Sequence, residues 1–477
     1  MSVRTERFNI ASINRTNTGN FSYKEGNPVI RFSMAGNDRL LDTSSLRLCC
    51  KVRVEMGDGS APQNNDTQAT PPVPANAIQS QLSANNGASS MISVLSITTG
   101  SGAQVETIRN YGRLAAQILQ QTNSWGDYST NLSYLHGATG NDKSEGRICN
   151  LASGNAGNMY SFSVCMPLLA GFLSMGNNVN LSNRNGTGGL EINLTLAPDV
   201  FSIFGKDAAT LGGSTVVWEN PVLTGTFIIP DDINSLPAEG TVPYSSWTSV
   251  YSVNQASDDQ RGYNLGLSRV VSQFNNTIAT EKLNNYAQNS SLTTELKRAD
   301  TVAAGNPANW AAPTAQTTFM RNGVNFPLDF NVIEDRNAPP TAAALGADVY
   351  ANSVFDVQRF LYSLDAILPY RQTSHLLAGG NSEGVANAGD ANSKYNYGNP
   401  KDYDWSGTQD FVIDGSVYSC GVRYDMLNSN NSTADFKNSQ FAERTVSRLD
   451  DTANSLFGYF LHKAAVNFGP NGVSVAV

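Results

Sequence analysis

The sequence predicts an all-β protein built from two antiparallel β sandwiches in tandem, and three observations lead to this prediction. The chain has 477 residues, which is too long for one ordinary core and suits two large β domains. Only 15 % of its residues are charged and 41 are glycine, as in many-stranded proteins with long neutral loops. Strand-like patterns recur in both halves while helix-length periodic segments are few, which disfavours a βαβ architecture.

The clearest strand pattern covers residues 46–55. Apolar side chains at every second position alternate there with polar ones, which predicts a strand with one face in a core and the other in water. Cys49 and Cys50 therefore point to opposite faces of the predicted sheet. Two further strands are predicted in this half, at 190–196 and 222–229.

Helices and loops are predicted between these strands. Apolar residues at spacings of three and four predict one helix over 105–118 and another over 353–364, the second capped by Ser353. The segment 165–173 predicts a strand end followed by one helical turn. Residues 57–90 lack lysine and arginine and are rich in Asn, Ala, Pro and Ser, so they predict a long exposed loop.

The second half shows the same pattern of strand-like segments and polar loops, although its sequence does not repeat that of the first half. Polar excursions separate strand-like pieces that are predicted at 326–333, 411–413, 417–424 and 473–477. Turn residues between Pro230 and Pro237 mark the best boundary between the two sandwiches. The predicted organisation is an N-terminal arm at 1–30, a first sandwich at 31–233 and a second at 234–477, with about eight strands in each sandwich.

Charge is unevenly distributed along the chain. The net charge is −9, which argues against a nucleic-acid-binding protein as a whole. Residues 1–53, however, carry nine basic and four acidic side chains, a local balance of +5. Residues 1–30, which include Arg4 and Arg7, show no strict alternation, so they predict an arm that faces an anionic interior and serves assembly more than folding. The alternative is a solvated N-terminal stretch without a special role.

Targeting signals and cysteine chemistry are not apparent. The N-terminus lacks the apolar core of a signal peptide and no run of about 18 apolar residues occurs, so we expect a product made in the cytosol and not secreted. The five cysteines are odd in number and contain no C-x-x-C pair, which predicts neither a disulfide framework nor a zinc site. They are Cys49, Cys50, Cys149, Cys165 and Cys420. Several Asn-x-Ser/Thr sequons occur, among them those at Asn14, Asn20, Asn131 and Asn193, and we expect no role for them.

Candidate catalytic and ligand-binding residues are few. The three histidines, His136, His375 and His462, lack an H-E-x-x-H or H-x-E context, and no nucleophile elbow or phosphate loop is present. The acid pairs Asp258-Asp259 and Asp402-x-Asp404 could hold a divalent cation, yet they lie among turn formers where exposed Asp is ordinary. Trp218, Trp247, Trp310 and Trp405 could form a sugar platform, although buried tryptophans are commoner. No catalytic, cofactor-binding or metal site is therefore predicted.

Three stretches, at 32–48, 167–197 and 322–327, carry a resemblance to a known family. The first holds an extended, basic-flanked segment followed by a core strand, the second a proline-leucine turn followed by a late strand, and the third an Asn-Gly-x-x-x-Pro turn. In this order they resemble the double jelly-roll major capsid proteins of tailless icosahedral DNA viruses. Size and composition look most like those of polinton-like viruses and virophages. The resemblance spans nearly the whole chain.

The resemblance implies two consecutive antiparallel eight-stranded jelly rolls with short helices and long loops. It also implies a non-enzymatic subunit that forms pseudo-hexameric homotrimeric capsomers of an icosahedral capsid in the virion. Its implied partners are neighbouring capsomers, penton and minor or cement capsid proteins, and an inner membrane or packaged DNA reached by the basic arm.

Two alternatives stay open, a glycan-binding β-sandwich lectin or adhesin and a β-sandwich hydrolase. A lectin of this size would usually carry a signal peptide or paired cysteines. A hydrolase would need convergent acids or histidines.

Overall fold

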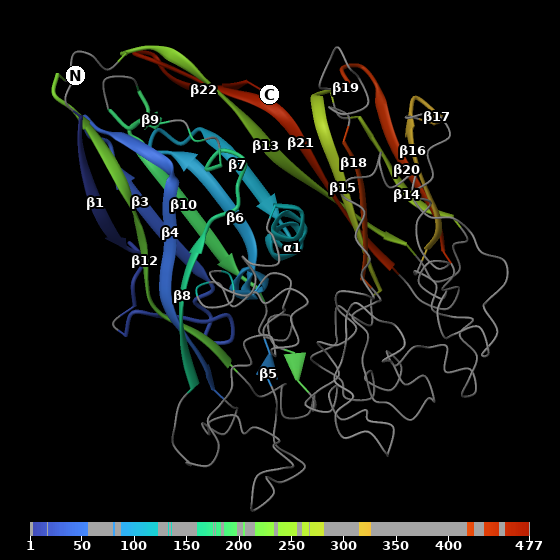
Figure 1. The fold of residues 1–477 in the computed structure, drawn as a ribbon, viewed down its shortest axis with the longest axis horizontal. Coiled ribbons are helices and arrows are strands. Elements are labelled where there is room, and N and C mark those ends of the chain that lie inside the picture. Colours follow the sequence, from blue (N-terminus) through green and yellow to red (C-terminus); the bar gives the residue numbers. More distant parts are fainter. Residues whose placement is uncertain are drawn as a thin grey trace, which may run out of the picture.

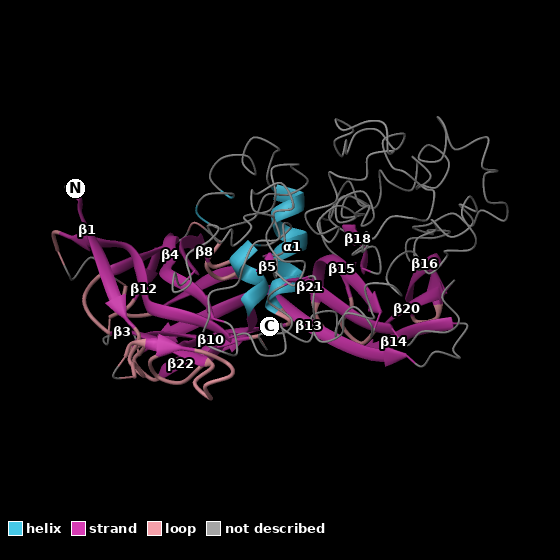
Figure 2. Ribbon diagram, turned by 90° about the horizontal axis from the view of Figure 1, so that it is seen from below, coloured by secondary structure: helices cyan, strands magenta, loops and turns pink. Residues whose placement is uncertain are grey.

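The computed structural model places most of the described chain in antiparallel β-strands, arranged as two sandwiches (Figure 1). It describes residues 3–16, 18–55, 80–81, 87–122, 132, 135, 160–174, 176, 178–182, 186–197, 204–205, 215–232, 237–254, 260–266, 268–280, 314–325, 417–423, 434–447 and 454–476. Helix α1 (Tyr111–Thr122) lies between the strands of the two sandwiches (Figure 2) and follows a 3-10 turn, η1 (Gly87–Met91), along the chain. Within the described residues, no helix is long and apolar enough to cross a membrane.

The first sandwich pairs a larger sheet, of order β1-β12-β4-β8, with a smaller sheet, of order β3-β10-β6-β7. These strands are β1 (Val3–Ala11), β3 (Val29–Ala35), β4 (Leu40–Glu55), β6 (Ile92–Thr99), β7 (Gln104–Arg109), β8 (Tyr160–Pro167), β10 (Gly189–Leu196) and β12 (Thr215–Pro230). Short strands β2 (Asn20–Phe21) and β9 (Asn178–Asn180) join the larger sheet, and β5 (Ser80–Gln81) pairs with β11 (Phe204–Gly205).

The second sandwich pairs a larger sheet, of order β13-β21-β15-β18, with a smaller sheet, of order β14-β20-β16-β17. These strands are β13 (Gly240–Asn254), β14 (Gln260–Gly266), β15 (Val270–Thr280), β16 (Thr314–Arg321), β17 (Val324–Asn325), β18 (Val417–Arg423), β20 (Gln440–Ser447) and β21 (Asn454–Gly469). Short strands β19 (Ala434–Asp435) and β22 (Gly472–Ala476) join the larger sheet.

Both sandwiches have the same strand order. When the eight main strands of each half are ranked along the chain, the larger sheet reads first, eighth, third, sixth and the smaller sheet reads second, seventh, fourth, fifth in both halves. All of these pairings are antiparallel. Two four-stranded paths interleaved in this way form a jelly roll. The prediction of two consecutive eight-stranded jelly rolls is confirmed.

Strand β4 shows why the alternating pattern was informative. Leu46, Leu48 and Val52 are at most 2 % exposed, whereas Cys49 lies on the opposite face to Cys50, as predicted. The strand begins six residues before the predicted start, because 40–42 pairs with β9 and β12. Burial of alternate side chains therefore fixes which face of this strand points into the first core.

The core of the second jelly roll is dominated by aromatic rings. Phe274 lies 4.5 Å from Phe460, 4.7 Å from Phe441 and 5.4 Å from Phe319 between ring centroids, and all four side chains are fully buried. They come from both sheets, since β15 and β21 belong to the larger sheet and β16 and β20 to the smaller one. Edge-to-face and offset ring contacts of this kind stabilise a core beyond simple area burial.

The helix predicted over 105–118 is correct only in its second half. Residues up to Arg109 form strand β7, Asn110 has a positive φ of 53°, and α1 begins at Tyr111. A β-bulge in the pairing of β7 with β6 inserts Val105, so that Val105 and Glu106 are both buried. This bulge disturbs the two-residue period and imitates a helical spacing.

The N-terminal segment corrects another expectation. Residues 3–11 are not a separate arm, because β1 pairs with β12 over its full length, from Val3 opposite Pro230 to Ala11 opposite Val222. Phe8 stacks on Phe227 with ring centroids 4.0 Å apart. Glu6, Phe8 and Ile10, at every second position, are partly buried, and the residues between them are exposed. This short alternation is enough for a strand because the edge of β12 supplies hydrogen-bond partners for its backbone. Residues 3–11 therefore serve folding directly.

The other predicted elements divide into those described and those outside the described residues. Strands predicted at 190–196, 222–229, 417–424 and 473–477 correspond to β10, β12, β18 and β22. In the turn between β16 and β17, Asn322 and Gly323 have φ of 51° and 80°, as Asn-Gly hairpin turns require. The predicted strands 326–333 and 411–413 and the predicted helix 353–364 lie outside the described residues. The loop predicted at 57–90 contains β5 and η1, and its other residues are not described.

Candidate functional site at the junction of the jelly rolls

The two jelly rolls share one hydrophobic core. Strands β13 and β21 of the second jelly roll contribute Tyr244, Trp247, Phe457 and Tyr459, which are at most 7 % exposed and belong to the same cluster as the core of the first. The ring of Phe172, from the turn after β8, meets the ring of Tyr244 edge-on at 5.2 Å. Because apolar surface of both halves is buried here, separating them would expose it to water.

A buried carboxylate lies at the centre of this junction. Glu106, on β7, is 3 % exposed. It accepts backbone N–H bonds from Gly171 at 3.2 Å and Phe172 at 2.9 Å within the first jelly roll. It accepts a third from Trp247, in the second jelly roll, at 2.6 Å. One side chain therefore satisfies backbone donors of both jelly rolls, and hydrogen bonds to a carboxylate are stronger than neutral ones.

The burial of Glu106 changes its acidity. Removal from water raises the pKa of this carboxyl to about 7, while the backbone hydrogen bonds from Phe172, Trp247 and Gly171 and the side chain of Ser246 oppose the rise. Burial wins because an ionised carboxyl loses more hydration than these donors return. The same burial raises the pKa of the hydroxyls of Tyr111 and Tyr244. The junction therefore contains one group that titrates near neutral pH.

Further hydrogen bonds join the jelly rolls along β7. The hydroxyl of Tyr244 donates to the carbonyl of Val105 at 2.6 Å, and that of Tyr459 donates to the carbonyl of Asn110 at 2.9 Å. The backbone N–H of Arg109 donates to Ser249 Oγ at 3.1 Å. These contacts lie at both ends of β7, so they restrain rotation of one jelly roll against the other.

Close backbone packing reinforces the junction. A Cβ atom at Gly171 would lie 2.0 Å from the carbonyl oxygen of Ser245 in β13. The turn that carries Gly171 is held from the other side by Tyr111, whose hydroxyl accepts the backbone N–H of Leu169 at 2.7 Å. Only glycine allows the two backbones to approach this closely.

A second buried polar group lies within the second jelly roll. His462 is 1 % exposed, and its Nε2 lies 2.8 Å from Thr248 Oγ1 and 2.7 Å from the guanidinium of Arg269. Burial, followed by the charge of Arg269, lowers the pKa of His462 to about 4. The imidazole is therefore neutral at neutral pH and accepts a hydrogen bond from Arg269.

The residues singled out in the sequence do not converge on a catalytic centre in the described chain. His462 and two tryptophans are described, and Trp218 (0 % exposed) and Trp247 (7 %) are too deeply buried to stack on a sugar. The remaining candidates, His136, His375, Asp258, Asp259, Asp402, Asp404, Trp310 and Trp405, lie outside the described residues. Among the residues that are described, no group of three or more potential metal ligands occurs.

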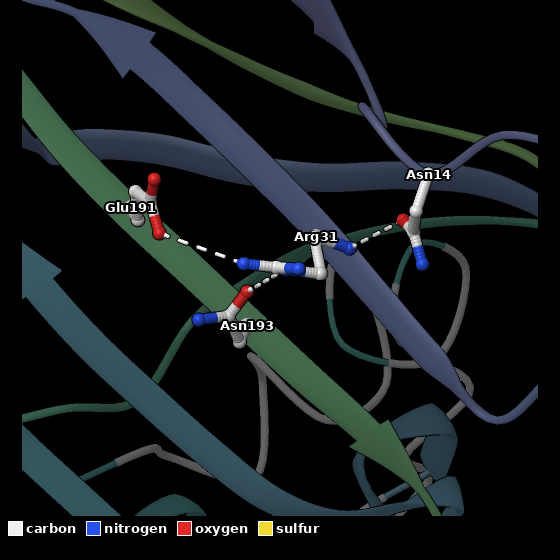
Figure 3. A network of polar contacts seen from close by, with 4 residues as sticks. All are labelled: Asn14, Arg31, Glu191 and Asn193. Atoms are coloured by element: carbon white, nitrogen blue, oxygen red, sulfur yellow. Dashed lines mark hydrogen bonds and ion pairs between the residues drawn. The ribbon is translucent and has the colours of Figure 1, made fainter. Parts of the chain in front are cut away.

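Two of the sequon asparagines have structural hydrogen bonds (Figure 3). Asn14 Oδ1 accepts the backbone N–H of Arg31 on β3 at 3.0 Å, and its Nδ2 donates to the carbonyl of Val29 at 2.6 Å. Arg31 Nε donates to Asn193 Oδ1 at 3.2 Å, and the guanidinium lies 3.9 Å from Glu191. These side chains tie the segment after β1 to the smaller sheet of the first jelly roll.

Two functional features were missed in the sequence, namely Glu106 and a pair of cysteines. Glu106 lies in the mixed segment Gln104–Arg109, where no local pattern distinguishes a buried acid from an exposed one. The register of β4 and β8 places Cys49 directly opposite Cys165, with their sulfur atoms 3.1 Å apart. Local patterns cannot reveal a contact between residues 116 positions apart.

Comparison with known proteins gives no sequence match. No family model and no curated protein matches the chain. Solved structures do match over nearly its whole length. A chain in the cryo-EM structure of the Sputnik virophage is 9 % identical, with 99 % of this chain and 88 % of that chain covered and a TM-score of 0.52.

Two crystallised or otherwise solved capsid proteins match equally well. The mavirus major capsid protein is 11 % identical, with 99 % of this chain and 90 % of that chain covered and a TM-score of 0.51. The Faustovirus major capsid protein is 9 % identical, with 97 % and 90 % covered and a TM-score of 0.51. The chain thus has the double jelly-roll fold of viral major capsid proteins. That fold is shared with the major capsid proteins of mavirus and Faustovirus.

Proposed function

We propose that this chain is a viral major capsid protein, a structural subunit without enzymatic activity that is incorporated into the virion. The observation that carries the proposal is the pair of jelly rolls with identical strand order, joined through one continuous core. A shell subunit must present fixed lateral surfaces to many neighbours, and a rigid tandem of sandwiches suits that task. The likeness in fold to the mavirus and Faustovirus capsid proteins supports this assignment.

The proposed assembly unit is a homotrimer. Three copies of two similar jelly rolls give six similar lobes, and hence a pseudo-hexagonal capsomer that can tile an icosahedral shell. A charged fraction of 15 % supports extensive contact with neighbours, since an isolated domain usually has about 25 %. We place the division between the jelly rolls near residue 233, between the end of β12 at Pro230 and the start of β13 at Gly240.

The proposed partners extend beyond the trimer. They are neighbouring capsomers, penton proteins and minor or cement capsid proteins. The basic N-terminal region would lie on the inner side of the shell, where Arg4 and Arg7, both exposed on β1, face an inner membrane or packaged DNA. Synthesis in the host cytosol precedes assembly.

Light scattering and negative-stain microscopy of the purified full-length chain test the assembly. We expect the mass of a trimer and particles of hexagonal outline. A stable, well-folded monomer at micromolar concentration would contradict the proposal. As an independent readout, an arginine-specific chemical reagent should modify the exposed side chains of Arg4 and Arg7 in free trimers and spare them in intact particles. Rapid modification of these arginines on intact particles would place β1 on the outer side.

A further inference from the structure

The cysteine pair on the larger sheet of the first jelly roll has the geometry of a disulfide site. Cys49 on β4 and Cys165 on β8 are directly opposite in antiparallel register. Residues in that relation have Cα atoms about 4.5 to 5.5 Å apart, within the range of about 4.4 to 6.8 Å that disulfides span. The thiol of Cys49 donates a hydrogen bond to Cys165 Sγ at 3.1 Å, so the side chains already point toward one another.

The pair is partly exposed and lies on the opposite face of the sheet from the neighbouring Cys50. Cys49 and Cys165 are half-buried and lie on the face of the sheet that carries Arg47 and Lys51. Cys50 points the other way and packs against the hydrophobic core. A small anionic disulfide such as oxidised glutathione would meet Cys49 and Cys165 on this cationic outer face, whereas Cys50 points away from it.

We propose that Cys49 and Cys165 form an intrachain disulfide when the protein meets an oxidising disulfide of the glutathione class. One thiol gives up its proton and attacks a sulfur of oxidised glutathione. The glutathione S–S bond breaks, a mixed disulfide forms, and one glutathione leaves as a thiolate that takes up the proton. The second cysteine loses its proton and attacks the protein sulfur of the mixed disulfide, which closes the Cys49–Cys165 bond and releases the second glutathione. The protein loses two electrons and glutathione disulfide gains them.

The disulfide between Cys49 and Cys165 should form slowly. Burial, together with the neighbouring Cys165 thiol, raises the pKa of Cys49 to about 12. Because the thiolate is the attacking species, we expect the reaction to be slow at neutral pH and to accelerate as the pH rises. The reduced form would therefore persist in a glutathione-buffered cytosol and close later in an oxidising medium.

The cross-link would fix β8 against β4. Strand β8 is the last strand on the described path of the larger sheet. It leads directly into the turn that carries Gly171 and Phe172, which donate to Glu106. The disulfide would close a loop of 116 residues, and long closed loops restrict the unfolded chain most. The inference concerns this sheet alone and does not depend on the proposed capsid function.

The test is peptide mapping of the oxidised full-length protein. Trypsin releases residues 48–51 and 148–184, and each peptide holds two cysteines. The Cys50→Ser, Cys149→Ser double variant removes this ambiguity. After reduction, removal of reductant, incubation with oxidised glutathione and blocking of free thiols, we expect the two peptides to appear joined and to separate on reduction. The melting temperature should be higher in the oxidised form than in the reduced form.

Matched variants keep the inference falsifiable. Adding Cys49→Ser to the double variant should abolish the joined peptide and the difference in melting temperature between oxidised and reduced protein. In the unsubstituted chain, fragmentation of the joined peptides should assign the bond to Cys49 and Cys165. Blocked or singly glutathionylated thiols without a joined peptide, or a bond to Cys420 in their place, would overturn the inference. Either result would leave the trimer test unaffected.

Discussion

The larger sheets of the two jelly rolls have the same strand order but different neighbours. One carries a charged outer face, and the other packs against the first jelly roll. In the first jelly roll, one face of β4 turns outward with Arg47, Cys49 and Lys51, and the two basic residues Lys51 and Arg53 pair with Glu219 at 3.8 and 2.9 Å. In the second, β13 and β21 place Tyr244 and Tyr459 against the first jelly roll. The fold of each unit therefore follows from strand pattern, while its position in the subunit follows from which side chains cover the sheet.

The buried ionisable groups differ in the same way. Glu106 belongs to the first jelly roll but holds a backbone donor of the second. His462 is enclosed within the second jelly roll by Thr248 and Arg269. One residue couples the two units and the other stabilises a single unit, so variants of the two should produce different unfolding behaviour.

The largest effect should follow from Glu106→Ala. The substitution leaves three buried backbone N–H groups without an acceptor, and each unsatisfied donor costs about 1 to 3 kcal/mol. We expect a loss of at least about 3 kcal/mol in the free energy of unfolding. We also expect the two jelly rolls to unfold in separate transitions. Urea unfolding followed by circular dichroism and tryptophan fluorescence measures both changes.

Glu191→Ala is the matched control for this variant. Its carboxylate side chain is 34 % exposed and lies 3.9 Å from Arg31, and exposed pairs contribute about 0 to 1 kcal/mol. Equal losses in the two variants, or a single unchanged transition in Glu106→Ala, would show that Glu106 does not couple the jelly rolls.

The pH dependence of stability should have opposite signs for Glu106 and His462. The pKa of Glu106 is raised from 4.5 to about 7 in the folded chain, so the native state binds more protons and stability falls as pH rises across that interval. The pKa of His462 is lowered from 6.5 to about 4, so the unfolded state binds more protons there and stability is lost as pH falls from 6.5 to 4. The two slopes oppose each other where the intervals overlap.

Glu106→Gln separates these contributions. The variant should keep the slope of His462, so that its stability rises with pH up to about 6.5 and then stays level. Subtracting its urea midpoints from those of the unsubstituted protein should recover a decrease between pH 4.5 and about 7. Parallel pH profiles of the two proteins would contradict a raised pKa at Glu106.

The smallest effect is expected from Phe8→Ala. The ring is half-buried and stacks on Phe227, so its loss should cost about 1 to 2 kcal/mol, less than truncation of a fully buried ring. Thermal unfolding of the full-length chain measures the change. An unchanged melting temperature would show that residues 3–11 contribute little to folding and would support a role in assembly alone. Arg7→Ala, on the exposed side of the same strand, is the control and should leave stability nearly unchanged.

Elements of the fold could be predicted from the sequence where the pattern that specifies them is local, and not where they depend on residues far away in the chain. Strands at 46–55 and 190–196 were predictable because their alternation is local. The helix over 105–118 was half wrong because the extra residue Val105 in the bulge of β7 disturbed the period. The segment 3–11 was misassigned because its partner β12 lies more than 200 positions later in the chain.

The candidate site was not predictable in the same way. Glu106 bonds to residues 65, 66 and 141 positions away, and Cys49 meets a partner 116 positions away. A single sequence contains no local pattern for such contacts. They arise from strand order, which becomes visible only when the sheets are assembled.

The close approach of Gly171 to Ser245 has a consequence for biosynthesis. The larger sheet of the first jelly roll is complete once β12 ends at Pro230, but the junction needs Ser245 and Trp247, which lie on the next strand. A nascent chain that has only just finished its first jelly roll thus exposes an apolar surface with Glu106 at its centre. Such surfaces make partly made chains prone to aggregation. Strand β13 follows directly, but it pairs with β21, which lies near the C-terminal end of the chain, and β21 supplies Phe457 and Tyr459 to the same junction. The surface therefore stays exposed until most of the second jelly roll has been synthesised.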